Sequence, residues 1–229
     1  MTSHDTSGAR AERSHENAYS GGERIRRASM ELTALSEAGL WYGEDQFDIE
    51  RFHRVGELAR KLMELVSAEP LPAYDEKVAS VAGYTTPKVD VRGAVFDDDG
   101  KVLLVREVLD EGRWTLPGGW CDILESPGAA VEREVREEAG LAVKAAHLAA
   151  VVDRERWPHR PPMDHHIYKL FFVCEPVGRV DLNYTSNETN GIGWFAVDDL
   201  PELSVSRVLP AQIALLQEHW RNPGPAYFD

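Results

Sequence analysis

The sequence predicts an α/β domain with a mixed sheet, preceded by a small helical domain. Three observations predict it: apolar residues repeat at helical spacing in the N-terminal third, the period changes to two near residue 86, and a charged helical segment then lies between strand-like segments. At 229 residues, with 43% hydrophobic content, the chain has the length and composition to bury a core.

Composition limits the classes of function. The formal net charge of −14 argues against a stable nucleic-acid partner, because such binding needs Lys and Arg to neutralise phosphates. It leaves a nucleotide substrate open, since bound cations reverse the field of an acidic site. No segment approaches the ~20 apolar residues of a membrane span, and no signal-peptide core is present, so we expect a cytoplasmic protein without a membrane partner.

The first 85 residues predict a leader and a helical domain. Residues 1–24 are rich in Ser, Gly, His and charge, which predicts a disordered leader. A helix is expected from Ile25 to Gly39, which supplies its stop. Asp48 is expected to cap a second helix that runs to Val66, and a short helical piece is expected at 74–82. A helical domain at 25–85 this small must pack on another domain or on a second copy, and we favour a homodimer.

The rest of the chain predicts a domain at 86–221 and a tail at 222–229. Val89, Val91 and Val95 alternate on a first strand, and a turn at 97–100 returns the chain to a partner strand. The further strands are expected within 113–119, 145–153, 166–174 and 191–195, and a last helix within 210–220. Strands on both sides of the charged helix favour a layered α/β sandwich.

The charged helix has clear start and stop signals. Ser126 is a suitable N-cap, Pro127 suits the first helical position, and Gly140 suits the left-handed stop.

Three glutamates crowd one side of this helix. Glu134, Glu137 and Glu138 stand at i, i+3 and i+4, so their side chains lie on one face and repel one another. A divalent cation is the partner that would compensate this repulsion.

The segment around these glutamates resembles the Nudix box. It reads G-x5-E-x7-R-E-U-x-E-E-x-G-U, with U apolar, from Gly119 to Leu141, without departure at a fixed position. The preceding LPGGW and the helical N-terminal segment resemble one Nudix subgroup, which includes CDP-choline pyrophosphatases and hydrolases of other nucleoside diphosphates linked to a moiety X. The resemblance implies the Nudix α/β/α sandwich.

The resemblance also implies roles for individual residues. Glu134 and Glu138 would be the principal ligands of Mg²⁺ (or Mn²⁺), and Glu137 a ligand or a holder of water. Gly118 or Gly119 would donate a carbonyl. The remaining roles concern positioning: Arg133 would orient the carboxylates, and Glu125 would tie the loop to the helix.

The general base is open between two places. In the family it is a box glutamate, here Glu134 or Glu137, or an acid from a later loop, for which Glu188 is the candidate. Many members carry a second acid before the following strand, where this chain has Gly191, and this departure weakens the case for Glu188.

Substrate contacts are expected from the loop between residues 153 and 169 and from the first strand. Arg154, Trp157 and His166 could contact phosphates or stack on a base, and ordinary loop packing is the alternative. Arg92 could contact phosphate or ribose, and an ion pair to Asp90 is its alternative.

Together these residues predict a metal-dependent pyrophosphohydrolase. Its substrate would be a small nucleoside diphosphate linked to X, either CDP-choline-like or ADP-ribose- and nucleotide-sugar-like, and its products a nucleoside monophosphate and phosphorylated X. Short RNA stays open as a substrate. The alternative is a nucleotide-sensing regulator that binds without turnover, and its expected mark, a degenerate box, is absent. A purely structural dimerisation module would leave the box unexplained.

Overall fold

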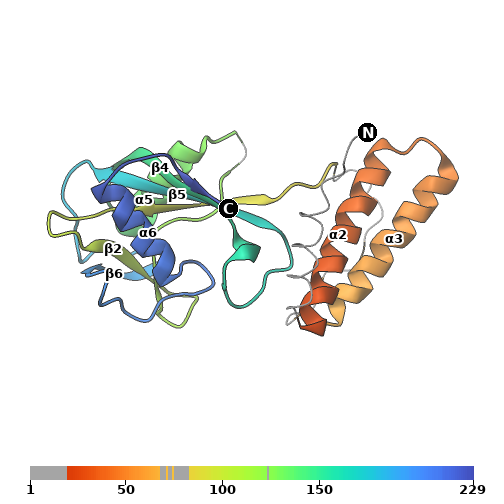
Figure 1. Ribbon diagram of the computed structural model, residues 1–229, viewed down its shortest axis with the longest axis horizontal. Helices are drawn as coiled ribbons and strands as arrows, with labels where there is room; N and C mark the ends of the chain where they lie inside the picture. Colours follow the sequence, from red (N-terminus) through yellow and green to blue (C-terminus); the bar gives the residue numbers. More distant parts are fainter. Residues whose placement is uncertain (1–19, 68–70, 72–73, 75–82, 123) are drawn as a thin grey trace, which may run out of the picture. The chain divides into compact units, whose positions relative to one another are not determined.

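The protein divides into two compact units, Met1–Thr86 and Pro87–Asp229, and each is described by itself (Figure 1). The computed structural model describes residues 20–67, 71, 74, 83–122 and 124–229. Residues 1–19 of the predicted leader (1–24) and 75–82 of the predicted helical piece (74–82) lie outside these residues. Over the described ranges, no helix combines the length and the apolar character needed to cross a membrane.

The first unit contains α2 (Gly21–Tyr42) and α3 (Gln46–Glu64), which lie side by side (Figure 1). Helix α2 begins before the predicted Ile25, because the Ser20 hydroxyl accepts a hydrogen bond from the Glu23 N–H. It also continues past Gly39. A Cβ at Gly39 would lie 2.3 Å from the Phe52 ring, so this glycine allows close helix packing and is not the predicted stop.

The cap of α3 also differs from the prediction. Asp45, three residues before the predicted Asp48, accepts hydrogen bonds from the N–H groups of Phe47 and Asp48. Both aspartates precede an apolar repeat, so the sequence pattern did not separate a cap from a first-turn acid. Two buried hydroxyls then join the helices, from Ser29 to the Ala59 carbonyl and from Ser36 to the Phe52 carbonyl.

The second unit contains two sheets. One has four strands in the order β1–β5–β4–β7, and the other has three in the order β3–β2–β6. β1 pairs parallel with β5 while β4 pairs antiparallel with β5, so the predicted mixed sheet is confirmed. The bounds are β1 Lys88–Ala94, β2 Val102–Glu107, β3 Trp114–Thr115, β4 Val143–Asp153, β5 Ile167–Pro176, β6 Thr189–Phe195 and β7 Tyr227–Phe228.

Two pairings differ from the sequence prediction. β2 is not the sheet partner of β1: beyond the end of β1 a single bridge joins Phe96 to Val102, and β2 then pairs with β3 and β6. The segment predicted as a tail also contains a strand. Within it, β7 pairs parallel with β4, and the Asp229 carboxylate accepts the Asp153 N–H.

Two helices cover opposite sides of the strands. α5 (Pro127–Ala139) and α6 (Pro210–Arg221) belong to different hydrophobic clusters. In β2, Leu103 joins the cluster of α5 and Leu104 joins the cluster of α6, as expected from the two-residue period of a strand buried on both faces. The predicted α/β/α sandwich is therefore confirmed, and α5 lies directly against β1 and β4.

Candidate active site

The site is built on α5, whose ends have the predicted signals. The Ser126 hydroxyl accepts the Ala129 N–H at 3.3 Å, Pro127 is the first residue, and Gly140 closes the helix at φ 62°. Val131 and Val135 are fully buried on the inner side. These contacts fix the rotation of α5 and decide which of its glutamates are buried.

The box glutamates lie in different environments. Glu134 and Glu138 are buried, with 8% and 4% of their surfaces exposed, whereas the Glu137 side chain is 57% exposed. Burial raises the pKa of Glu134, and it raises the pKa of Glu138 to about 8 against the opposing effect of Arg92. Two buried carboxyls one helical turn apart disfavour each other's charge, and a cation would restore it.

Arg133 connects the helix to the loop before it. Its guanidinium donates to Glu125 at 2.9 and 3.0 Å, to Glu134 at 2.8 Å and to Glu137 at 3.2 Å. It also donates to the Trp120 carbonyl at 3.2 Å. The planar fork of an arginine suits such multiple contacts. The contacts match the positions predicted for Arg133 and Glu125, and their roles in catalysis stay predictions.

The glycine loop approaches the buried end of Glu138. The Gly118 N–H donates to Glu138 Oε2 at 2.9 Å. Gly118 has φ 149°, and a Cβ there would lie 2.1 Å from the Val91 carbonyl oxygen, so only glycine fits.

The carbonyls of this loop alternate in direction. Those of Pro117 and Gly119 accept N–H groups of β1, from Gly93 and Val91. Among the described residues no donor reaches the Gly118 carbonyl, and the role of either glycine as a metal ligand stays a prediction.

The donor set suits a hard divalent cation, although the carboxylates do not converge on one point. Across the described ranges, no three Asp, Glu, His or Cys side chains form a ready metal-binding group. Glu134 is turned to Arg133 and Glu138 to the Gly118 N–H, while Glu137 extends into solvent. Carboxylate and carbonyl oxygens are the ligands that Mg²⁺ and Mn²⁺ prefer, so the residues fit the metal in kind.

The predicted loop acid Glu188 lies beside the C-terminal end of α5. Its carbonyl accepts the Val108 N–H, and the neighbouring Thr189 hydroxyl donates to the Glu138 carbonyl at 2.7 Å. Its side chain is exposed. The structure therefore brings the start of β6 to the box helix, as the prediction required, without a contact that decides the base.

Glu107, at the end of β2, is a candidate that the sequence analysis missed. It is 5% exposed, and burial raises its pKa against the effect of Arg207, whose Nε lies 3.0 Å from Oε1 of Glu107. Glu107 also acts to raise the pKa of Glu138, as a nearby carboxyl would. The sequence did contain a signal for this candidate, because Glu107 is an acidic residue at the end of a largely apolar strand.

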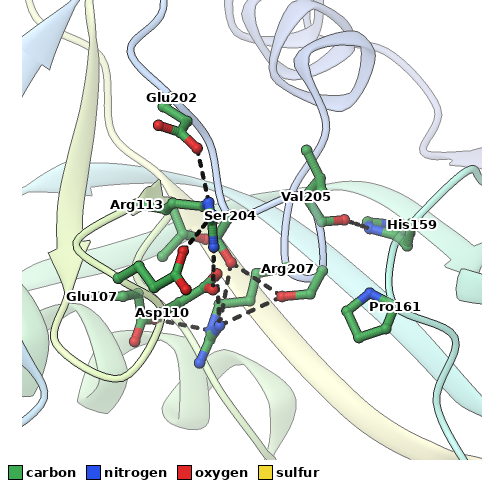
Figure 2. A network of polar contacts seen from close by, with 12 residues as sticks. Glu107, Asp110, Arg113, His159, Pro161, Glu202, Ser204, Val205 and Arg207 are labelled. Carbon is green, nitrogen blue, oxygen red and sulfur yellow. Dashed lines mark hydrogen bonds and ion pairs between the residues drawn. The ribbon is translucent and has the colours of Figure 1, made fainter. Parts of the chain in front are cut away.

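Figure 2 shows how Glu107 is held. Arg207 lies between Glu107 and Asp110, and its Nη1 donates to the Ser204 hydroxyl at 3.2 Å. Asp110 is in turn 3.0 Å from Arg113, which also contacts Glu202 at 2.9 Å. The network fastens the loop before α6 to the end of β2.

The four predicted substrate residues have protein partners in this structure. Arg92 is 4% exposed and makes two contacts to Asp90 and one to the Leu116 carbonyl, so the ion pair is present and a substrate contact stays a prediction. Arg154, in the short helix η1 (Arg154–Arg156), is 3% exposed and donates to the Pro161 and Ser206 carbonyls.

The aromatic candidates are also engaged. The Trp157 indole N–H donates to Asp229 at 2.9 Å, and His166 Nε2 lies 2.9 Å from Asp153. Arg92 is electrostatically linked to Glu138, whereas the other three belong to the loop between β4 and β5. The structure does not bring the four together as one substrate-binding surface.

Comparison with known proteins decides the family. A model of the NUDIX domain matches residues 86–216, more than half of the chain. The chain belongs to the Nudix family. A second model, described as a UDP-X-like N-terminal oligomerisation domain, matches residues 23–76 of this Nudix hydrolase.

Relatives of this Nudix hydrolase cover most of its length. YjhB of Bacillus subtilis (strain 168), whose name provisionally describes an ADP-ribose pyrophosphatase, is 37% identical over 195 residues, which are 85% of this chain and 91% of YjhB. A crystal structure of a UDP-X diphosphatase is 29% identical with a TM-score of 0.58, over 91% of this chain and 99% of that one. An ADP-ribose pyrophosphatase from Streptococcus suis 89-1591 is 37% identical with a TM-score of 0.56, over 63% and 100%. The protein is thus a Nudix pyrophosphohydrolase.

Proposed function

We propose that this Nudix hydrolase cleaves the diphosphate of a nucleoside diphosphate linked to X, with Mg²⁺ or Mn²⁺, to a nucleoside monophosphate and phosphorylated X. The observation that carries the proposal is the pair of buried carboxyls, Glu134 and Glu138, beside the Gly118–Gly119 loop. The names of the relatives favour ADP-ribose or a nucleotide sugar as substrate over CDP-choline.

Each residue of the site would have a separate role. Glu134 and Glu138 would hold the metal with the Gly118 carbonyl, and Arg133 would orient Glu134 while it keeps Glu125 and the loop in place. A bound divalent cation supplies charge neutralisation of the diphosphate and a lower pKa for a coordinated water. Most of the catalytic effect in such a site is electrostatic, so the loss of one ligand charge is costly.

The base that takes the proton of the attacking water would be Glu137 or Glu188. Both side chains are exposed, and neither is committed to a buried contact. Glu137 is one residue from Glu138 and contacts Arg133, whereas Glu188 lies on the loop that leads into β6. Glutamine at each position, compared by kcat on one substrate, identifies the base by the larger loss.

The N-terminal unit would build a homodimer. The matching domain is described as an oligomerisation domain, and α2 and α3 leave Leu35, Leu58 and Phe47 exposed at 55%, 44% and 67%. Burying apolar side chains of this size in an interface is favourable, because it removes apolar surface from water.

The test is a panel of ADP-ribose, UDP-glucose, CDP-choline, dinucleoside polyphosphates and short RNA with Mg²⁺ and with Mn²⁺. We expect hydrolysis of at least one nucleoside diphosphate derivative, and ¹⁸O from water will mark the attacked phosphorus. Glu138→Gln should lower kcat by two or more orders of magnitude with the fold intact. Glu175→Gln, at an exposed position of β5, is the matched control. Binding of the panel without turnover by the wild-type protein would instead support a nucleotide sensor.

A further inference from the structure

An aromatic surface lies directly beside the glycine loop. Trp120 is 42% exposed, and its ring lies 5.7 Å from the ring of His165 at an interplanar angle of 51°. The Lys88 Nζ is 5.6 Å from the centre of the Trp120 ring. We name these three residues the Trp120 shelf.

The fold brings the shelf together from three separate segments. Trp120 is bridged antiparallel to Asp90, and residues directly opposite one another project from the same face of a sheet. Lys88 is two residues before Asp90 on β1, so it shares that face. The Lys88 N–H donates to the His166 carbonyl, which holds the His165–His166 segment against the start of β1.

The shelf is coupled to the candidate reaction centre through the backbone. Trp120 is the next residue after Gly119, and its carbonyl accepts a hydrogen bond from Arg133. The same guanidinium contacts Glu134 and Glu137. A substrate whose diphosphate lies at the box carboxylates can therefore reach the shelf with a neighbouring group.

The chemistry of the shelf selects among the groups of such a substrate. An exposed indole can stack on a planar ring or hold a cation over its face. Lys88 already places an ammonium over Trp120, and it would repel the trimethylammonium group of a choline. A neutral aromatic base meets no such repulsion.

His165 adds a polar group to the stacking surface. Its Nε2 is buried and has no hydrogen-bond partner among the described residues. Burial and Lys88 lower the pKa of His165, so its ring is neutral near pH 7 and carries one N–H donor and one acceptor nitrogen. A neutral ring adds no charge beside Trp120, which suits an uncharged base.

We propose that the Trp120 shelf is the nucleobase subsite of this enzyme, with the base stacked on Trp120 beside His165 and Lys88. The proposal rests on the function proposed above and assigns it a recognition surface that the four substrate residues predicted from sequence do not form. The X group would then lie on the far side of the diphosphate from the shelf.

Calorimetric titration of the product nucleotides tests the shelf without turnover. AMP, UMP, CMP and GMP should each be compared with ribose 5-phosphate in the presence of Mg²⁺, on the wild type and on Trp120→Ala. Loss of a stacking partner costs ~1–3 kcal/mol, or a roughly 5- to 150-fold weaker Kd for the preferred nucleotide. The affinity for ribose 5-phosphate should not change.

Two further variants separate stacking from bulk. Trp120→Phe should recover most of the affinity, and Trp120→Leu should not, because leucine restores apolar volume without a π-face. In turnover, Trp120→Ala should raise KM at nearly constant kcat. Equal weakening of AMP and ribose 5-phosphate would make Lys88 and Trp120 a phosphate site, and unchanged affinity for every nucleotide would remove the shelf from recognition. Failure of the wild type to hydrolyse any substrate would overturn the proposed function and leave this binding test readable.

Discussion

Single residues at the site are constrained by backbone geometry as much as by chemistry. Gly118 shows this most directly, because its φ of 149° and the Val91 carbonyl leave no space for a Cβ. The residue sets the direction of its N–H toward Glu138. The sequence predicted a glycine loop here, but only the fold shows which glycine is irreplaceable.

We predict that Gly118→Ala lowers the free energy of unfolding by ~1–3 kcal/mol, the usual cost of a strained backbone conformation, and lowers kcat as the N–H turns from Glu138. Urea denaturation and kcat on the best substrate of the panel measure the two effects. Gly128→Ala is the matched control. Its nearest neighbour would be 3.9 Å away, so helix propensity should keep or raise stability. Equal stability of the two variants would contradict the geometry.

His159 supplies a pH prediction at the residue scale. It is 2% exposed, its Nδ1 lies 2.9 Å from the Val205 carbonyl, and its Nε2 lies 3.1 Å from the amide nitrogen of Gln212. A neutral ring satisfies both contacts, donating from Nδ1 and accepting at Nε2. Burial lowers the pKa of His159 to about 4, from 6.5 in the unfolded chain.

The direction of the pH effect on stability follows from proton binding by the folded and unfolded chains. Between pH 6.5 and 4 the unfolded chain binds a proton at His159 that the fold does not, so acidification through this window should reduce the free energy of unfolding by about 3 kcal/mol. Urea denaturation at pH 7 and pH 4.5 should show a smaller difference for His159→Asn, which keeps a donor near Nδ1. A difference as large in His159→Asn as in the wild type would contradict this origin of the pH dependence.

At the scale of elements, α5 was the most predictable part and the helical hairpin the least. The N-cap, first proline and left-handed stop of α5 are local signals, and all three are confirmed. By contrast, Gly39 resembles a stop in sequence but serves the packing of Phe52, a contact with a residue on the next helix. β2 likewise follows a turn, as a hairpin partner of β1 would, yet it belongs to the second sheet, between β3 and β6. Tertiary contacts decided both cases.

The same limit explains why Glu107 and Trp120 were not predicted as candidates. Both become candidates through contacts with Arg207, His165 and Lys88, which are distant in sequence. The predicted Trp157 and Arg154 had suitable chemistry. In the structure, Trp157 donates to the Asp229 carboxylate and Arg154 to a backbone carbonyl. The family motif located the carboxylates because their spacing is local to one helix, whereas substrate contacts depend on loops that meet only in the fold.

The Arg133 contacts give a prediction for the loop–helix element. Arg133→Lys keeps the charge but loses the fork that reaches Glu125, Glu134 and the Trp120 carbonyl together. We expect kcat to fall about 10- to 100-fold and the Mg²⁺ concentration for half activity to rise, as for other groups that orient metal ligands. Arg136→Lys, in the last turn of α5, is the control. Loss of kcat at unchanged Mg²⁺ dependence would place Arg133 at the substrate instead.

At the scale of the whole molecule, we propose separate tasks for the two units. The second unit holds every residue of the candidate site, and the first leaves apolar side chains in solvent along a pair of helices. A helical pair this small buries little surface by itself, and a second copy of the chain would cover it. The matching oligomerisation domain points the same way.

We therefore predict that the protein is a homodimer in solution and that Leu35→Glu shifts it toward monomer. A charge in a packed interface is left without a partner and costs several kcal/mol, which lowers the dimer fraction at micromolar concentration. Light scattering after size exclusion, from about 1 to 100 μM, measures the mass. Val177→Glu, 64% exposed on the second unit, is the control and should stay dimeric. A Leu35→Glu protein that remains dimeric with an unchanged helical spectrum would exclude this part of α2 from the interface, and a monomeric wild type would leave the exposed leucines without the proposed partner.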